Sequence, residues 1–170
     1  MPKSELTARC TNTVDYSKIQ KLLREAEVKV LVGFPSGRMH VATKHTKKKG
    51  KRYTASIQSE RETAVLASDL HFGTAHIPAR PFLFDGITKN KKEIVKVMKT
   101  EMGKKVKGGK TNWEKIASFT VGKIQEFVRS DFYKKHVPNS DETIVRKGSD
   151  TPLIDGGDLM GNLSFIVEKK

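Results

Sequence analysis

The longest hydrophobic pattern in the chain has the period of an α-helix. Its apolar positions recur three and four residues apart and form one wide stripe: Trp113, Ile116, Ala117, Thr120, Ile124, Phe127 and Val128. Thr111 and Glu114 stand three residues apart at its start, which is the spacing of a capping box. A second helical pattern precedes it and breaks at the flexible sequence Lys107-Gly108-Gly109; it comprises Ile87, Lys91, Ile94, Val95, Met98 and Met102. The two patterns predict two long antiparallel helices whose apolar stripes belong to the core.

Two short stretches alternate between apolar and polar residues and predict β-strands. The first, Val28 to Phe34, places Val28, Val30 and Val32 opposite Lys29 and Leu31, and it ends at a turn containing Gly33, Pro35 and Gly37. In the second, near the C-terminus, Leu163, Phe165 and Val167 alternate with Ser164, Ile166 and Glu168. We expect these strands to pair antiparallel. The segment between residues 38 and 56 predicts a basic loop or a loose hairpin, with Tyr53 to Ile57 as the returning strand.

Shorter helices are predicted by caps and local periodicity. Ser17 and Gln20 have capping-box spacing ahead of a helix from about Ser17 to Glu27, and a further helix spans about Ser59 to Phe72. The unit from Ser140 to Gly148 has acidic residues in its first turn and basic residues in its last, so its charges complement the helix dipole. Residues 1–16 lack periodicity and predict a flexible N-terminal arm. Residues 1–170 therefore predict one α+β domain: a small antiparallel sheet packed with two long helices and shorter helices, with a mobile basic loop.

The stretch from His71 to Phe84 joins two predicted helices and is rich in proline. Gly73 follows an apolar helical pattern, where a residue with positive φ commonly ends a helix. Pro78 and Pro81 push the preceding residues, Ile77 and Arg80, into extended conformations, so the sequence predicts a stiff connector. An arginine held in such a segment offers a preorganised donor fork to a carboxylate or phosphate. The alternative is a loop that is anchored in the core by Phe82-Leu83-Phe84, a tripeptide too apolar to lie in water.

The formal net charge of +14 is distributed unevenly. No acidic residue occurs between Glu27 and Glu60, and that interval contains Lys44, Lys47, Lys48, Lys49, Lys51 and Arg52. We expect these side chains to face DNA, because such a charge run binds phosphates without reading sequence. Only Tyr53 stands among them as a base-stacking aromatic.

A second basic concentration falls within the predicted long helices. It consists of Lys89, Lys91, Lys92, Lys96, Lys99, Lys104, Lys105, Lys107 and Lys110, with only Glu93 and Glu101 among them. Lysines on a helix surface are commonly a solvated face, and this is the interpretation that the sequence favours for them.

Several classes of protein are not supported by the sequence. No run approaches the roughly 20 apolar residues of a membrane span, and the N-terminus has no apolar signal segment, so we expect a soluble protein of the cytoplasm. Cys10 is the single cysteine. His71 with His76 lacks a third metal ligand, and glycines surround Asp155 and Asp158. We therefore expect no metal, no cofactor and no enzymatic activity.

Two sequence blocks, in this order and separated by two predicted helices, carry a family resemblance. The first holds Phe72-Gly73-Thr74 and Ile77-Pro78-Ala79-Arg80-Pro81-Phe82-Leu83; the second holds Arg146-Lys147-Gly148-Ser149, Pro152-Leu153-Ile154-Asp155, Gly157 and Leu159. Together they resemble the neck and tail-completion proteins of long-tailed bacteriophages, which join heads to tails in virion morphogenesis. The resemblance runs from about Val28 to the C-terminus and covers the basic segment from Lys44 to Arg52 poorly. Gly156 replaces the threonine that usually follows the aspartate.

The resemblance implies a non-catalytic α+β subunit of the virion, assembled in the host bacterial cytoplasm. Several copies, expected to be six, would form a ring at the head–tail junction and contact connector or stopper proteins, tail terminator or tail tube proteins, and the genomic DNA in the lumen. We expect subunit or partner contacts at Ile77, Pro78, Arg80, Pro81, Leu83, Asp155 and Leu159. The alternative is a free, non-specific nucleic-acid-binding protein that acts through Lys44 to Arg52. No membrane contact is expected in either case.

Overall fold

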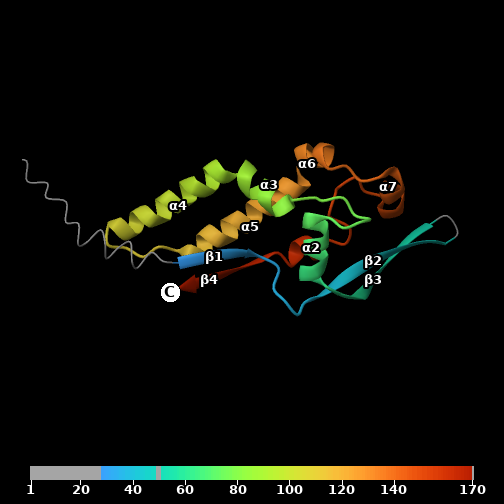
Figure 1. Ribbon diagram of the computed structural model, residues 1–170, viewed down its shortest axis with the longest axis horizontal. Helices are drawn as coiled ribbons and strands as arrows, with labels where there is room; N and C mark the ends of the chain where they lie inside the picture. The colour runs from blue at the N-terminus through green and yellow to red at the C-terminus, as the bar shows by residue number, and fades with distance from the viewer. Residues whose placement is uncertain (1–27, 49–50, 170) are drawn as a thin grey trace, which may run out of the picture.

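A computed structural model describes residues 28–48 and 51–169, with side chains for 28–39 and 62–168 (Figure 1). In chain order its elements are β1 (Val28–Gly33), β2 (Met39–Lys48), β3 (Lys51–Glu62), α2 (Thr63–Phe72), α3 (Phe82–Lys89), α4 (Lys91–Val106), α5 (Trp113–Arg129), α6 (Asp131–His136), α7 (Asp141–Lys147), α8 (Asp158–Gly161) and β4 (Ser164–Lys169). The predicted α+β class is confirmed. The predicted arm at 1–16 and helix at 17–27, with Cys10, lie outside the described residues.

Strands β1 and β4 pair antiparallel, as predicted, although they lie at opposite ends of the described chain. Val28 stands opposite Lys169, and Gly33 stands opposite Ser164. The alternating valines of β1 are partly buried, because helix α5 packs on that side of the sheet. Helix α5 in turn lies between the sheet and α4 (Figure 1). The β1–β4 sheet, α5 and α4 are thus three layers, and we call this part of the molecule the body.

The core is assembled around α5. Its buried members come from several elements that are far apart in sequence: Ala67, Phe82, Ile124, Phe127, Val128, Tyr133, Leu159, Met160 and Leu163. Phe34, just after β1, meets Phe82 edge-on with ring centroids 6.1 Å apart. The predicted stripe of α5 is confirmed from Ile116 to Val128, whereas Trp113 is only half-buried.

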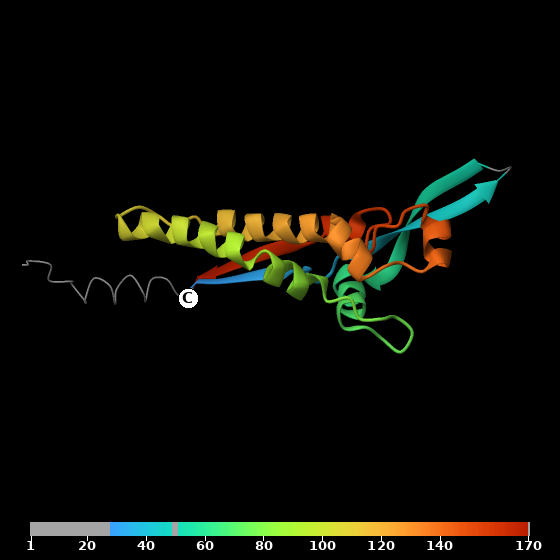
Figure 2. The same cartoon turned by 90° about the horizontal axis from the view of Figure 1, so that it is seen from above.

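Helices α4 and α5 run antiparallel and are joined at a glycine turn in which Gly108 has φ of +87° (Figures 1 and 2). Two details differ from the prediction. Asn112, rather than Thr111, caps α5, since its Oδ1 accepts a hydrogen bond from the Lys115 amide at 2.9 Å. The helical pattern predicted from Ile87 to Met102 is divided at Asn90 into α3 and α4.

The apolar stripe predicted for α4 is only partly buried. Ile94 and Glu101 are the buried residues of this helix, while Ile87 of α3 and Met102 are exposed. Helix α4 packs against α5 and, near its start, against α3, so a narrow contact stripe is enough to hold it. The prediction that Ile87 and Met102 belong to the core is therefore wrong.

Strands β2 and β3 form a long antiparallel hairpin that projects from the body (Figures 1 and 2). Met39 pairs with Glu62 and Lys48 with Lys51, with one irregularity between Met39 and Val41. Of the two predicted alternatives, loop or hairpin, the structure has the hairpin, so residues 44–48 and 51–52 are paired strands rather than a mobile loop. Threonines and other β-formers on both strands favour this extended pairing. Because β3 continues to Glu62, α2 begins at Thr63 instead of near Ser59.

Candidate subunit interface

The connector between α2 and α3 closes on itself and protrudes from the body (Figure 2). Thr74 donates its amide to the Ile77 carbonyl at 2.8 Å, and its Oγ1 accepts from the Ile77 amide at 3.1 Å. Gly73, with φ of +82°, ends α2 as predicted, and a Cβ there would lie 2.8 Å from the Ala79 nitrogen. The stiff extended connector predicted from the prolines is therefore wrong for residues 74–77, because the threonine hydroxyl stabilises a turn.

Arg80 faces the interior of its own subunit. Its amide donates to the Leu70 carbonyl at 2.9 Å, and its Nη1 donates to Oδ1 of Asn139 at 3.5 Å. Asn139 is buried and donates its Nδ2 to the Asp150 carbonyl at 3.1 Å. The Nε of Arg80 is buried with no hydrogen-bond partner among the described residues. Through Asn139, Arg80 links the connector to the segments that precede and follow α7. Contact of Arg80 with a carboxylate or phosphate of a partner stays a prediction.

Two titratable groups surround Arg80. Burial raises the pKa of Tyr133, whose hydroxyl lies in the core without a hydrogen-bond partner in the described part of the chain, and nearby Asp85 adds to the rise while Arg80 opposes it. Burial also lowers the pKa of Lys147, which Asp155 opposes. The Nζ of Lys147 donates to the Thr151 carbonyl at 2.9 Å. Arg80, Tyr133 and Lys147 therefore form a polar cluster that is partly removed from solvent.

Helix α7 is the most faithfully predicted local unit. Ser140 caps it by accepting from the Thr143 amide at 3.3 Å, and Gly148 ends it in the left-handed conformation. After the helix, Leu153 adopts φ of +58°, which costs a non-glycine residue roughly 1–2 kcal/mol. Its side chain packs against the core and offsets that cost.

The residues expected at a subunit or partner interface divide into three groups by burial. Leu159 is buried in the core and Leu83 packs against it, so both stabilise their own subunit. Ile77 and Pro81 are half-buried, and Pro81 directly precedes α3. Pro78 and Asp155 are exposed, and of the set they remain the most accessible to a partner.

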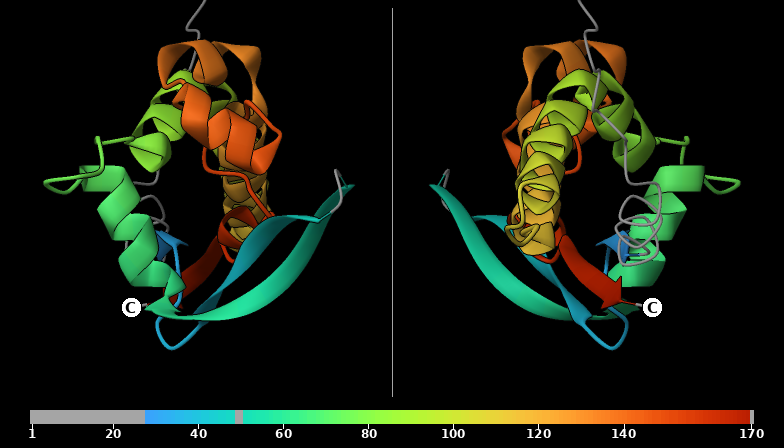
Figure 3. Two further views of the ribbon diagram at one scale, coloured as in Figure 1. Left: turned by 90° about the vertical axis from the view of Figure 1, so that its right-hand side faces the viewer. Right: turned by 90° about the vertical axis from the view of Figure 1, so that its left-hand side faces the viewer.

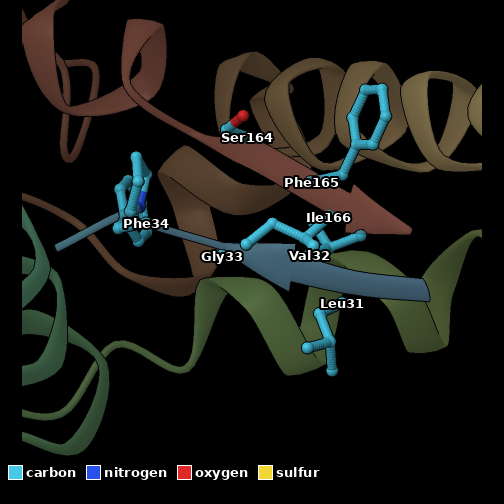
Figure 4. Close-up of a pocket in the computed structure, with 8 residues that line it drawn as sticks. Leu31, Val32, Gly33, Phe34, Ser164, Phe165 and Ile166 are labelled. Carbon is cyan, nitrogen blue, oxygen red and sulfur yellow. The ribbon is translucent and has the colours of Figure 1, made fainter. Parts of the chain in front are cut away.

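An apolar surface that was not predicted lies on the outer face of the β1–β4 sheet. Leu31 and Ile166 stand directly opposite each other, 50% and 56% exposed. An open groove of about 240 Å³ borders this pair and is also lined by Phe34, Pro35 and Phe165. Phe165 stands opposite Val32 and points to the other side of the sheet from Leu31, so it belongs to the face that packs on α5 and not to the outer face (Figure 4). The sequence held a signal for this surface: Leu31 shares its strand face with Lys29, and Ile166 shares its face with Ser164 and Glu168, where solvent would favour polar residues.

Two exposed phenylalanines flank the connector. Phe72, the last residue of α2, is 76% exposed, and Phe84, in the first turn of α3, is 67% exposed. Phe82 is fully buried, so the expectation that the tripeptide Phe82-Leu83-Phe84 avoids water is correct for its first residue and wrong for its third. Exposed aromatic side chains beside a protruding loop are typical of contact surfaces.

The basic residues expected to face DNA lie in the hairpin, except Lys49, which is outside the described residues. Lys44 and Lys47 lie in β2, where Lys47 pairs with Arg52, and the last pair, Lys48 with Lys51, is also of like charge. Like charges opposite each other destabilise a strand pair.

The described residues hold no group of three or more histidine, cysteine, aspartate or glutamate residues that could bind a metal. His71, which together with His76 lacks a third metal ligand in the sequence, packs its ring edge-on against Phe82 with centroids 5.5 Å apart. None of the described helices is both long enough and apolar enough to cross a membrane. No protein-family model matches the chain, and no curated protein or solved structure matches it.

Proposed function

We propose that this protein is a structural subunit of a ring at the head–tail junction of a long-tailed bacteriophage. Its role is to complete the tail or neck so that the tail joins the DNA-filled head, without catalysis. Its neighbours are further copies of itself, connector or stopper proteins towards the head, and terminator or tube proteins towards the tail. In the mature particle it belongs to the virion.

The observation that carries this proposal is the convergence of the two blocks on which the family resemblance rests. Arg80 of the first block contacts Asn139, which in turn binds the backbone beside the second block. Phe82 of the first and Leu159 of the second belong to the same buried cluster. Blocks that are distant in sequence thus form one compact unit, as expected if they are a family's shared structural element.

The accessible surface supports assembly. The opposed pair Leu31 and Ile166 gives the β1–β4 sheet an apolar outer face, and Phe72 and Phe84 give the connector region a second one. Closed rings form through heterologous contacts, in which two different surfaces of each subunit meet. Two separate apolar surfaces and a projecting hairpin are candidate surfaces for such contacts and so support the proposal.

Light scattering of the purified protein, together with negative-stain electron microscopy, tests the assembly half of the proposal. We expect a closed ring of uniform size, either alone or after addition of the tail or connector proteins of the same phage. A protein that stays monomeric with all of these partners and binds only nucleic acid would contradict the proposal and favour the nucleic-acid-binding alternative.

A further inference from the structure

Both carboxylates of α4 are engaged in ion pairs. Glu93 lies 2.9 Å from the Nζ of Lys123 on α5. Glu101 is buried, and its Oε1 lies 2.7 Å from Lys104 and 2.9 Å from Lys115 of α5. The negative charge of α4 is therefore neutralised by neighbouring lysines.

The opposite face of α4 carries lysines without carboxylates. An α-helix turns by about 100° per residue, so the residues of α4 opposite the buried pair Ile94 and Glu101 are Lys92, Lys96, Lys99 and Gly103. Lys107, the residue that ends the helix, continues this row. All four lysines are exposed, and none of them has an ion-pair partner among the described residues. Lys96 stands at the edge of the row, where it also borders an open groove between α4 and α5 that Glu93 and Phe119 line. No described element covers this side, because α5 packs on the other one (Figures 1 and 3).

A merely solvated helix face usually mixes both signs of charge, since opposite charges four residues apart stabilise the helix. The row Lys92, Lys96, Lys99 and Lys107 lacks this mixing over about 22 Å, at 1.5 Å per residue from Lys92 to the C-cap of α4. Repulsion along such a row is relieved when phosphates approach it. Duplex DNA presents about one phosphate charge per 1.7 Å of its axis, so several phosphates lie within reach of the row.

We propose that this lysine row, Lys92, Lys96, Lys99 and Lys107, binds the phosphate backbone of duplex DNA without reading its sequence. Packing on α5 fixes the backbone of α4, so binding orders only the lysine side chains. This surface differs from the hairpin lysines to which the sequence assigned DNA contact. The inference does not depend on ring formation, because one subunit carries the whole row.

Fluorescence anisotropy of the full chain with a labelled mixed-sequence duplex of about 20 base pairs tests this assignment. Binding is measured from about 50 to 200 mM salt for three proteins: the wild type, a quadruple variant Lys92→Gln, Lys96→Gln, Lys99→Gln and Lys107→Gln, and a matched hairpin variant Lys44→Gln, Lys47→Gln, Lys48→Gln and Lys51→Gln. Each variant removes four positive charges. For the α4 variant, we expect the slope of log K, the DNA-binding constant, against log salt concentration to be shallower than the wild-type slope by about 3 to 4. We expect the hairpin variant to keep the wild-type slope.

A matching Lys→Arg variant of the α4 row retains the charge and should retain both binding and slope. Thermal unfolding of each variant establishes that it is folded, since exposed lysine substitutions change stability little. Three results would overturn the proposal: no binding by the wild type at the lowest salt, an unchanged slope in the α4 variant, or an equal loss in both glutamine variants, which would reflect net charge alone.

Discussion

The Nζ of Lys115 on α5 lies 2.9 Å from Oε1 of Glu101 on α4. Lys104 approaches the same oxygen to 2.7 Å, and the Glu101 side chain is 1% exposed. Hydrogen bonds from Lys104 and then Lys115 lower the pKa of Glu101 from 4.5 to about 2, while burial works in the opposite direction. A single carboxylate thus joins the two long helices near their connecting turn.

The ion pairs of Glu101 with Lys104 and Lys115 predict that part of the folding stability is lost in acid. A carboxyl group whose folded-state pKa lies below its unfolded value stabilises the protein fully above the unfolded pKa, and this contribution disappears as pH falls. For Glu101 the loss occurs between about pH 4.5 and pH 2. Glu101→Gln should therefore lower the melting temperature at neutral pH and flatten its dependence on pH in that interval.

Melting temperatures measured from pH 2 to pH 7 test this prediction. Glu93→Gln is the control, because the Glu93 side chain is 57% exposed and Lys123 keeps a second carboxylate partner in Glu126, so the loss should be about 1 kcal/mol or less. If wild type and Glu101→Gln lose stability in parallel between pH 4.5 and pH 2, the ion pair does not have the assigned role.

Phe82 and Phe84 lie two residues apart in α3 and should respond differently to truncation. Phe82 is fully buried, so Phe82→Ala should lower the free energy of unfolding by about 3–5 kcal/mol. Phe84 is 67% exposed, and Phe84→Ala should change it by no more than about 0.5 kcal/mol. Chemical denaturation measures both values. Similar losses in the two variants would mean that Phe84 is packed in solution.

Gly73 is predicted to tolerate no side chain. With φ of +82° and a backbone nitrogen 2.8 Å from the position of a Cβ, Gly73→Ala should destabilise the protein by about 1–2 kcal/mol or more. Gly122 lies in α5 with open space around it, so Gly122→Ala should instead stabilise the protein by up to about 1 kcal/mol. Thermal unfolding of both variants decides the matter, and a stabilised Gly73→Ala protein would contradict the described turn.

The apolar pair Leu31 and Ile166 is predicted to act in assembly more than in folding. Threonine keeps a strand-forming side chain, so the double variant Leu31→Thr and Ile166→Thr should unfold within about 1 kcal/mol of the wild type. We expect its oligomers to dissociate at protein concentrations where the wild type remains assembled. Size-exclusion chromatography with light scattering measures this. The variant Lys29→Gln and Glu168→Gln, from the neighbouring pair on the same face, serves as control, and equal assembly of all three proteins would remove this face from the interface.

Features determined by neighbouring residues could be predicted from the sequence. The cap at Ser140, the charges of α7 and Gly148 at its end act within a few residues of one another, and the structure has all of them. The alternation in β1 likewise predicted a strand and separated its valines from Lys29 and Leu31, and the structure has that strand. The alternation did not indicate that the Leu31 face is the one left uncovered, because that depends on where α5 packs.

Features determined by tertiary packing could not be predicted. The buried carboxylate of Glu101 on α4 is paired with Lys115, which comes from another helix. No local sequence pattern indicates that pairing. Likewise, the inward orientation of Arg80 depends on Asn139, which lies 59 residues away. The turn at Thr74 formed against the expectation from proline, because a hydroxyl hydrogen bond favoured a closed conformation.

Electron microscopy of lysates from a phage that lacks this gene, with and without the protein supplied in trans, tests the proposed junction role most directly. If the subunit completes the neck or tail, DNA-filled heads and full-length tails should accumulate unjoined, because neither structure requires the junction ring to form. Supplying the protein in trans should restore joined, infectious particles. Normal infectious particles without the protein, or empty heads alone, would contradict the account.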